Sequence, residues 1–279
     1  MNPHPPDPNP RPNPARLVAT DLDGTLLRRD GTVSARTRDA LRATVAAGVD
    51  VVLVTARPPR YLDALAAEVG LVGHVLCANG AMVYDLATRE VVKVRALAAV
   101  AARVVVAALS AAMPGVGFAV ETGVGVVFEP GFAKDNRSGD LRLPAADHAD
   151  MWRLGEPIVK LLAWTASATA DELLAVAMAA VGDQAECTHS GGGGLIEVSA
   201  AGVSKVAALS WLCAERGIEP AEVVAFGDMP NDLAMLRWAG TGYAVANAHE
   251  SVLAGAAART ASNDDDGVAL VLERMLARR

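Results

Sequence analysis

Two carboxylates two residues apart, Asp21 and Asp23, follow a short apolar segment and precede Gly24. At the end of a buried strand such a pair can converge on a hard cation, and the glycine lets the backbone approach closely. An Asp-Gly pair is also common in ordinary turns, so the motif alone leaves a simple turn as an alternative. A calcium-binding loop is excluded, because Leu26 and Thr32 stand where that loop needs glycine and glutamate.

A second acidic pair lies far along the chain, where Asp228 and Asp232 follow the apolar segment 222–226. Pro230 favours the start of a helix between them, so both carboxylates can face the end of the preceding strand. An aspartate in the first turn of a helix is usually a cap, which accounts for Asp232. That ordinary role does not account for Asp228.

Two further candidate functional groups are the hydroxyl of Thr55 and the ammonium of Lys205. Thr55 follows the apolar segment 49–54, where its hydroxyl could donate to a phosphate oxygen, although capping a helix is the commoner role. Lys205 lies in the first turn of a predicted helix, where the helix dipole disfavours a cation. Carboxylates or a phosphate nearby would compensate, and an exposed lysine on a solvated face is the simpler alternative.

Alternating strands and helices position these groups. Buried strands are predicted at 16–21, 49–54 and 74–78, with helices between them at 34–47 and 58–70. This alternation is typical of the α/β class with a doubly wound parallel sheet. It returns late in the chain with helix 203–216, strand 222–226, a helix after Pro230, strand 243–246 and helix 267–276.

The alternation stops within residues 84–194, where short β-like segments surround two alanine-rich helices. We predict an inserted α+β cap domain there, and a catalytic core made of residues 15–83 and 195–279. Residues 1–14, rich in proline and asparagine, are predicted to be a disordered tail. An open α/β sheet places its ligand crevice at the carboxyl ends of the strands, where all four polar groups fall.

In their order and spacing these motifs resemble the haloacid dehalogenase superfamily. Asp-Leu-Asp-Gly-Thr at 21–25, Thr55 after the next strand, Lys205 opening a late helix and Gly-Asp-Met-Pro-Asn-Asp at 227–232 are similar to its four motifs. The insertion between the second and third motifs resembles a C2 cap, and Asn-Gly-Ala at 79–81 is similar to the Cof-type sugar phosphatase branch. The resemblance covers nearly the whole chain after the tail and implies a Rossmann-like core.

The resemblance also implies catalytic roles. Asp21 would be the nucleophile that takes a phosphoryl group, and Asp23 would be the general acid and base. Thr55 and Lys205 would hold the phosphoryl group during the transfer.

The implied cofactor is Mg²⁺, and its ligands would be Asp21, the backbone carbonyl of Asp23 and Asp228. Asp232 would support this site through Lys205 or through the waters of the metal. The implied substrate-binding residues are Gly24, Ala56, Arg57, Asn79 and Asn231. Two departures leave the roles of Arg57 and Asn247 open. The family often has glycine at the position of Ala56, and it has Met-Gly-Asn-Ala where this chain has Val-Ala-Asn-Ala at 245–248.

The function that follows is a magnesium-dependent phosphatase of small phosphomonoesters, sugar phosphates above all, with an aspartyl-phosphate intermediate on Asp21. Attack by a carboxylate on a phosphate dianion needs cations to neutralise the transferring group, which Mg²⁺ and Lys205 would supply. A phosphomutase on the same scaffold is one alternative. A catalytically silent binding or regulatory protein is another, and the intact acids argue against it.

Charge and hydropathy exclude other classes of function. The formal net charge of −7 gives no broad basic field for nucleic acid. The longest apolar segment, 96–113, is rich in alanine and carries Arg103 near its middle, which predicts an amphipathic cap helix instead of a membrane span. With three widely spaced cysteines and no apolar signal segment at the start, we expect a cytoplasmic protein with reduced thiols, as monomer or homodimer.

Two weaker features concern the cap. The glycine-rich segment 190–194 lacks the lysine and hydroxyl of a phosphate-binding loop and is predicted to be a hinge that returns the cap to the core. Lys134, Arg137 and Lys160 could contact the polar part of a substrate, but surface or hinge positions are the favoured interpretation.

Overall fold

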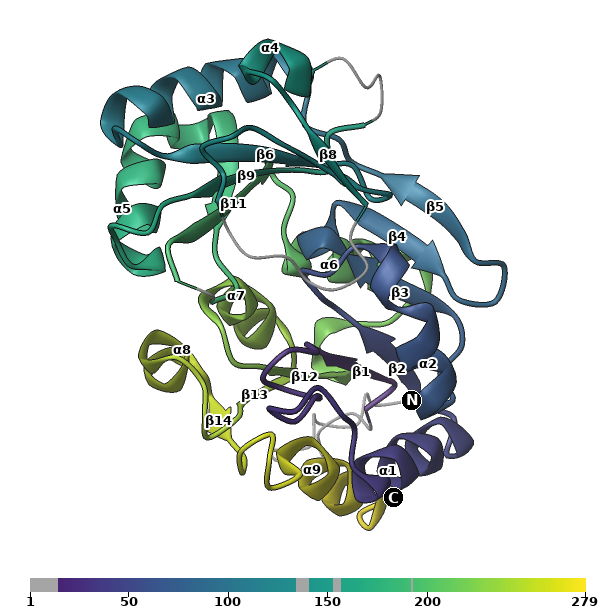
Figure 1. Ribbon diagram of the computed structural model, residues 1–279. Coiled ribbons are helices and arrows are strands. Elements are labelled where there is room, and N and C mark those ends of the chain that lie inside the picture. Colours follow the sequence, from purple (N-terminus) through teal and green to yellow (C-terminus); the bar gives the residue numbers. More distant parts are fainter. Residues whose placement is uncertain (1–14, 134–140, 153–156, 192) are drawn as a thin grey trace, which may run out of the picture.

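A parallel sheet forms the centre of the larger domain in the computed structural model, which describes residues 15–133, 141–152, 157–191 and 193–279 (Figure 1). The strands lie in the order β14, β13, β12, β1 and β2. Their bounds are Leu17–Thr20 (β1), Asp50–Leu53 (β2), Val223–Gly227 (β12), Thr241–Ala244 (β13) and Ala258–Arg259 (β14). The predicted tail, residues 1–14, lies outside the described residues.

The order of the strands reverses between β1 and β12. From β1 the chain proceeds to β2 and then to β3 (His74–Cys77), which joins the sheet through a parallel bridge between Val54 and Leu76. In the other direction it proceeds through β12, β13 and β14, so the doubly wound α/β prediction is confirmed. A crevice forms where two neighbouring strands send their connections to opposite sides, and Asp21 and Asp228 directly follow these two strands.

Helices cover both faces of this sheet because side chains alternate along each strand. Val18 faces the side packed by α1 (Ala35–Ala46), α2 (Asp63–Val69) and α9 (Gly267–Leu276), whereas Leu17 and Ala19 face α6 (Lys205–Glu215), α7 (Pro230–Trp238) and α8 (Glu250–Gly255). Ser34 is the N-terminal capping residue of α1, since its side chain accepts a hydrogen bond from the Thr37 N–H. A short 3₁₀ turn, Pro59–Tyr61, precedes α2.

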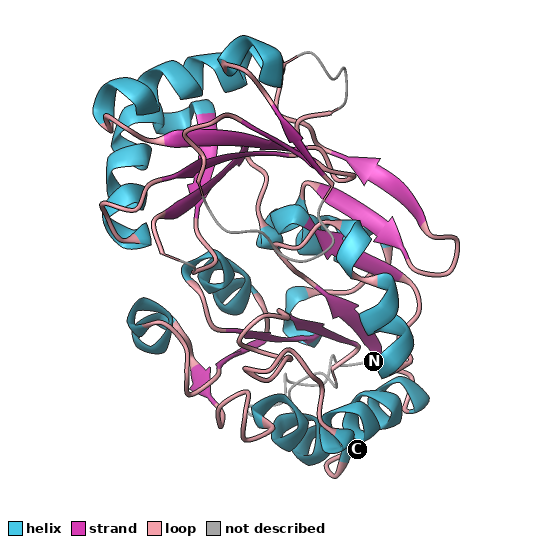
Figure 2. Cartoon of the chain, in the orientation of Figure 1, coloured by secondary structure: helices cyan, strands magenta, loops and turns pink. Residues whose placement is uncertain are grey.

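The cap contains a six-stranded sheet in the order β10, β11, β9, β6, β7 and β8. The strands are Gly117–Glu121 (β6), Val126–Phe128 (β7), Arg142–Pro144 (β8), Lys160–Trp164 (β9), Ala185–Thr188 (β10) and Leu195–Ala200 (β11). Helices α3 (Ala99–Ala112), α4 (His148–Met151) and α5 (Ala170–Val181) lie on its outer side. The sheet therefore lies between these helices and the core (Figures 1 and 2).

The pairing of strands indicates where the cap begins and ends. Strands β4 (Met82–Asp85) and β5 (Glu90–Val94) pair with β3 of the core, and β11 pairs with β9 and β10 of the cap. We therefore propose that the cap spans about residues 95–201. The predicted hinge is wrong, because the segment after β10 connects two strands of the cap sheet and does not return to the core.

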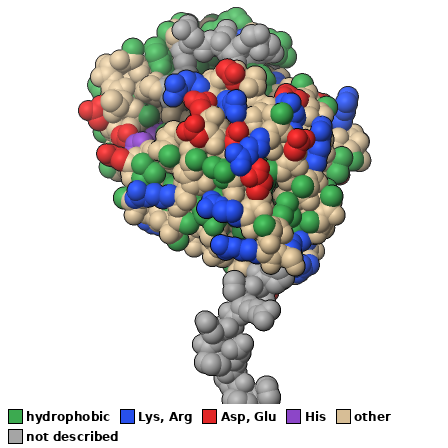
Figure 3. Space-filling model, turned by 90° about the horizontal axis from the view of Figure 1, so that it is seen from below, with side chains coloured by type: hydrophobic (Ala, Val, Ile, Leu, Met, Phe, Trp, Pro, Cys, Tyr) green, Lys and Arg blue, Asp and Glu red, His purple; other side chains and the backbone are tan. Residues whose placement is uncertain are grey.

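The segment 96–113 forms α3, whose Ala102, Val105 and Leu109 are buried in the cap. In the described part of the chain, no helix has both the length and the apolar character needed to cross a bilayer. Viewed from the side of α1 and α9, the described acidic and basic side chains are interspersed with apolar ones (Figure 3).

Candidate active site

A buried lysine joins two carboxylates at the carboxyl end of the core sheet. Lys205, the first residue of α6, donates from Nζ to Asp21 Oδ1 and to Asp232 Oδ1, both at 2.6 Å. Burial alone would lower the pKa of Lys205, but the two carboxylates outweigh burial and raise that pKa. The alternative of a solvated lysine is therefore wrong, and the acids supply the compensation that the helix dipole requires.

Asp228 lies beside this pair, in the loop between β12 and α7. Its Oδ1 accepts a hydrogen bond from Thr25 Oγ1 at 2.7 Å. Burial, reinforced by the neighbouring Asp232, raises the pKa of Asp228 to about 7, although Thr25 and Lys205 act in the opposite direction. Gly24 has a φ of +82°, and a Cβ there would come within 2.4 Å of Asp228 Oδ2, so the first motif needs glycine at this position.

Asp21, Asp228 and Asp232 offer oxygen atoms that lie within 4.8 Å of one another. Burial raises the pKa of Asp21 well above the usual aspartate value, Lys205 opposes this, and the two other acids add to it. Three buried carboxylates and one ammonium leave excess negative charge, which a hard divalent cation bound to oxygen ligands would neutralise. The residues present therefore fit Mg²⁺.

Asp232 is already fully engaged within this cluster. Its Oδ1 accepts from Lys205, and its Oδ2 accepts from the backbone N–H groups of Asp228 and Met229, each at 3.1 Å. These contacts fix the ammonium and the loop that carries Asp228. Of the two roles implied for Asp232, the geometry favours support of Lys205.

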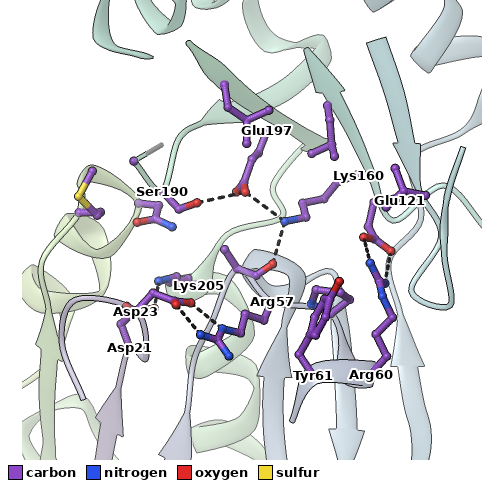
Figure 4. Close-up of a pocket in the computed structure, with 18 of the residues that line it drawn as sticks. Asp21, Asp23, Arg57, Arg60, Tyr61, Glu121, Lys160, Ser190, Glu197 and Lys205 are labelled. Carbon is purple, nitrogen blue, oxygen red and sulfur yellow. Dashed lines mark hydrogen bonds and ion pairs between the residues drawn. The ribbon is translucent and has the colours of Figure 1, made fainter. Parts of the chain in front are cut away.

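Asp23 lies at the edge of the cavity and is paired with Arg57. The guanidinium donates from Nε and Nη2 to the two carboxylate oxygens at 2.7 and 2.5 Å. The Asp23 side chain is 42% exposed, so it is accessible from the cavity (Figure 4). Arg57, whose role the sequence left open, thus has a defined partner.

Two further predicted residues support this end of the sheet. Thr55 is fully buried, and its Oγ1 accepts a hydrogen bond from the Arg57 N–H at 3.0 Å. Asn247 donates from Nδ2 to the carbonyl oxygen of Gly24 at 2.8 Å, which fixes the first loop. The side chains of Ala56, Val245 and Ala246, which differ from the usual residues of the family, take no part in these two hydrogen bonds.

A chain of polar contacts connects the core to the cap. Asn231 donates to Asn79 Oδ1 at 3.1 Å, and Asn79 donates to Glu197 Oε2 at 2.5 Å. Glu197 Oε1 lies 3.3 Å from Lys160 Nζ, which donates to the Ala56 carbonyl at 2.8 Å. Asn79 adopts a left-handed conformation with φ of 58°, which lets one side chain reach both neighbours.

Lys160 corrects the prediction of a surface or hinge position. Its side chain is only 4% exposed and extends from β9 of the cap towards the core (Figure 4). Lys134 and Arg137 lie outside the described residues. Sequence reasoning also missed Glu197, although an acid between Ile196 and Val198 in an apolar strand was a usable signal.

The cap and the core enclose a cavity of about 320 Å³ above Asp21. An ion pair joins the two domains beside this cavity, because Arg60 of the core donates to both carboxylate oxygens of Glu121 in β6 at 2.7 and 2.8 Å. Among the described residues, its core lining is Asp21, Asp23, Ala56, Arg57, Pro58, Arg60, Tyr61, Lys205, Met229 and Asn231, and its cap lining is Glu121, Val126, Phe132, Arg142, Lys160, Leu162, Ser190, Gly191, Leu195 and Glu197. Five predicted site residues lie behind this lining: Gly24, Thr55, Asn79, Asp228 and Asp232.

Comparison with known protein families decides the class. The sequence model of the family described as haloacid dehalogenase-like hydrolase matches residues 18–272. The chain belongs to this family. The match includes the core, the cap and all four motifs, so the resemblance inferred from the motifs is confirmed.

Curated relatives of this haloacid dehalogenase-like hydrolase are phosphatases. The phosphoglycolate phosphatase of Natronomonas pharaonis is 30% identical over 260 residues, which cover 92% of this chain and 96% of that protein. The 5-amino-6-(5-phospho-D-ribitylamino)uracil phosphatase YwtE of Bacillus subtilis is 28% identical over 291 residues, covering 94% and 98%. The chain is accordingly a hydrolase of the phosphoric monoester class.

Solved structures of the family share the fold. A haloacid dehalogenase-like hydrolase from B. subtilis matches with a TM-score of 0.79 and 25% identity, covering 92% of this chain and 99% of that one. A sugar phosphatase of subclass IIB, BT4131, matches with a TM-score of 0.76 and 20% identity, covering 93% and 98%. Core and cap are therefore arranged as in a known two-domain architecture.

Proposed function

We propose that this hydrolase is a magnesium-dependent phosphatase that transfers the phosphoryl group of a small phosphomonoester to Asp21 and then to water. The observation that carries the proposal is the contact of Asp21 and Lys205 at 2.6 Å on the floor of the cavity, beside two further buried acids. This arrangement places a nucleophile, an ammonium and a cation site around one point. Such preorganised charge is the main requirement of phosphoryl transfer.

Asp21 would attack the phosphorus atom with one carboxylate oxygen and form an aspartyl phosphate, which divides the hydrolysis into two easier steps. Lys205 would hold Asp21 in its attacking orientation and bind a phosphoryl oxygen. Thr55, held by the Arg57 N–H, would donate its hydroxyl proton to another phosphoryl oxygen. Mg²⁺, held by Asp21, the Asp23 carbonyl and Asp228, would neutralise the charge of the transferring group.

Asp23 would protonate the leaving oxygen in the first step and accept a proton from water in the second. In the structure its carboxylate accepts two hydrogen bonds from Arg57. A substrate phosphate offers Arg57 a second anion with the same fork geometry. Movement of Arg57 towards the phosphate would free Asp23, which would then take up a proton from solvent and donate it to the leaving oxygen.

The substrate proposal rests on the size of the cavity and on the relatives. A volume of about 320 Å³ is at the small end for ligand pockets, which suits a metabolite with one short carbon chain or ring. The relatives named for phosphoglycolate and for a phosphoribityl compound, and the solved sugar phosphatase, act on small phosphorylated molecules. Sugar phosphates and related polyol phosphates are therefore the first candidates.

The test is a phosphate-release screen with Mg²⁺ over sugar phosphates, polyol phosphates and nucleotides. Asp21→Asn should lose activity on every substrate. Asp39→Asn is the matched control, because Asp39 is 77% exposed on α1. Transfer of the phosphoryl group to a second sugar without release of phosphate would show a phosphomutase instead. Full activity of Asp21→Asn, or no turnover of any phosphomonoester, would overturn the proposal.

A further inference from the structure

Three hydrogen-bond donors surround the buried carboxylate of Glu197 in β11 of the cap. Its Oε1 accepts from Ser190 Oγ at 3.1 Å and lies 3.3 Å from Lys160 Nζ (Figure 4). Its Oε2 accepts from Asn79 Nδ2 at 2.5 Å. An ionised carboxylate only accepts hydrogen bonds. Asn79 must therefore direct its NH2 group, and not its oxygen, towards Glu197.

This contact determines the orientation of two amide groups in the core. The nitrogen and oxygen ends of an amide have similar shapes, so hydrogen-bond partners decide which way the group points. Because Asn79 Nδ2 is directed to Glu197, its Oδ1 is free to accept from Asn231 Nδ2, at 3.1 Å. We call the contacts from Glu197 through Asn79 to Asn231 the amide relay. Its polarity leaves the carbonyl end of Asn231 without a role inside the relay.

The carbonyl oxygen of Asn231 is an acceptor that lacks a donor. Asn231 lines the cavity, and its Oδ1 is buried with no hydrogen-bond partner among the described residues. A buried acceptor in this state costs free energy until a donor reaches it. Asn231 directly precedes Asp232, whose carboxylate contacts Lys205. This part of α7 therefore borders the proposed reaction centre.

An acceptor at this place does not suit the phosphoryl group. Phosphoryl oxygens are acceptors as well, and two acceptors cannot form a hydrogen bond with each other. A hydroxyl on the leaving group can donate. A carboxylate at the same place would face the Asn231 carbonyl oxygen without a hydrogen bond, so the orientation of one amide can discriminate between the two kinds of ester.

We propose that Asn231 is a specificity-determining residue that accepts a hydrogen bond from a leaving-group hydroxyl, and that Glu197 is the positioning residue that orients it through Asn79. Because Glu197 belongs to the cap and both asparagines belong to the core, this orientation depends on the contact between the two domains. The inference rests on the proposed phosphatase function and adds a determinant of its selectivity.

Two esters of similar length test the inference with Mg²⁺ present. 2-Hydroxyethyl phosphate carries a hydroxyl donor where phosphoglycolate carries a carboxylate acceptor. Glu197→Gln keeps the shape of the side chain but can donate, so both asparagines can turn and release the NH2 group of Asn231. We expect the ratio of kcat/KM for the hydroxyethyl ester to that for phosphoglycolate to fall by at least about tenfold, since a donor replaces the acceptor.

Glu121→Gln is the matched control for charge. Glu121 lines the same cavity and pairs with Arg60, outside the amide relay. This variant removes the same charge without changing a partner of Asn79, so the ratio should fall much less than in Glu197→Gln. Equal falls in the two variants would show that charge alone changes the selectivity, and would overturn the inference.

Transmission through Asn79 is tested with Asn79→Gly, because glycine tolerates the φ of 58° at this position. In this background Glu197→Gln should lower the ratio no more than Glu121→Gln does. A full fall there would contradict the amide relay. So would an equal change of kcat/KM for both esters in Glu197→Gln alone, which is the result expected if Asn231 binds a water molecule instead of the leaving group.

Hydrolysis of p-nitrophenyl phosphate identifies the variants that are folded and active. If the unmodified protein hydrolysed neither this ester nor the two others, the phosphatase function would be overturned instead. Calorimetric binding of 2-hydroxyethyl phosphate and phosphoglycolate to the same proteins then tests the amide relay. Glu197→Gln should shift the ratio of the two dissociation constants towards phosphoglycolate, and an unchanged ratio would overturn the inference.

Discussion

Lys205 is the residue on which the catalytic floor depends. Its ammonium is the common partner of Asp21 and Asp232, and its side chain is 1% exposed. Lys205→Met would leave two buried carboxylates facing each other without a countercharge. Removing one partner of a buried ion pair typically costs about 3–5 kcal/mol, so we expect a loss of that order in the free energy of unfolding, together with loss of activity.

Urea unfolding measures the first effect and phosphate release the second. Arg29→Met is the control, because Arg29 is 87% exposed and makes only a 3.7 Å ion pair. An unfolding free energy equal to that of the unmodified protein would show that Lys205 does not compensate the acids.

Asp23 can be tested separately, because its side chain is partly exposed and its removal should leave the fold intact. We expect Asp23→Asn to lower kcat for a sugar phosphate by about 10²- to 10⁴-fold, the usual contribution of a general acid. The loss should be much smaller for p-nitrophenyl phosphate if phosphorylation of Asp21 limits the rate, since p-nitrophenolate leaves without a proton. An equal loss on both esters would contradict a role in protonating the leaving group.

For single residues, the sequence motifs predicted the catalytic groups of the core but not the cap residues that line the cavity. Asp21, Lys205 and Asp228 come together because each follows or begins an element of the core, and strand order determines where those elements end. Lys160 and Glu197 meet only after two cap strands pair and the cap folds onto the core. Spacing along the chain carries no sign of that contact.

At the scale of the elements, the start of α5 in the cap contacts the residue that precedes α8 in the core, outside the cavity. Asp171 in the first turn of α5 lies 3.2 Å from His249 Nε2 of the core and 3.2 Å from His189 Nε2 of the cap. The backbone N–H of His249 donates to the Asp228 carbonyl at 2.8 Å. The position of the cap is thereby connected to the loop that carries a proposed metal ligand.

We expect Asp171→Ala to loosen cap closure without changing the chemistry. The Asp171 side chain is 60% exposed, and contacts of this kind contribute roughly 0.3–1 kcal/mol. KM should therefore rise by about two- to fivefold with kcat nearly unchanged. Steady-state kinetics measure this, with Asp183→Ala, at an exposed position after α5, as control. A fall in kcat without a change in KM would argue against a role in closure.

Local patterns located the elements of the core well, because β1 and β2 are continuous apolar segments and α1 has a serine cap. They leave the limits of the cap open. β4 and β11 have the composition of strands, but composition does not say which sheet a strand joins. Hydrogen-bonded partners decide that, and one of the two partners of β11, strand β9, lies more than 30 residues earlier in the chain.

For the whole molecule, the buried acids Asp21 and Asp228 predict how stability responds to pH. The pKa of Asp228 is raised by burial to about 7 in the folded protein, from an ordinary aspartate value of 3.8, and burial also raises the pKa of Asp21. A folded-state pKa above the unfolded value means that the folded state binds more protons between the two. The stabilisation from Asp228 is complete below about pH 4 and is lost as pH rises through about 7.

Mg²⁺ should weaken this dependence, since it binds the ionised carboxylates and competes with their protons. With a chelator present, we expect the thermal midpoint of unfolding to fall between pH 5 and pH 8. With millimolar Mg²⁺ the midpoint should fall less, so that the stabilisation by the metal is larger at pH 8 than at pH 5. In Asp228→Asn, which lacks the titrating group, both the fall and the stabilisation by Mg²⁺ should shrink. If the two pH profiles ran parallel with and without Mg²⁺ in the unmodified protein, the acids would not form the cation site, because proton release and metal binding would then be independent.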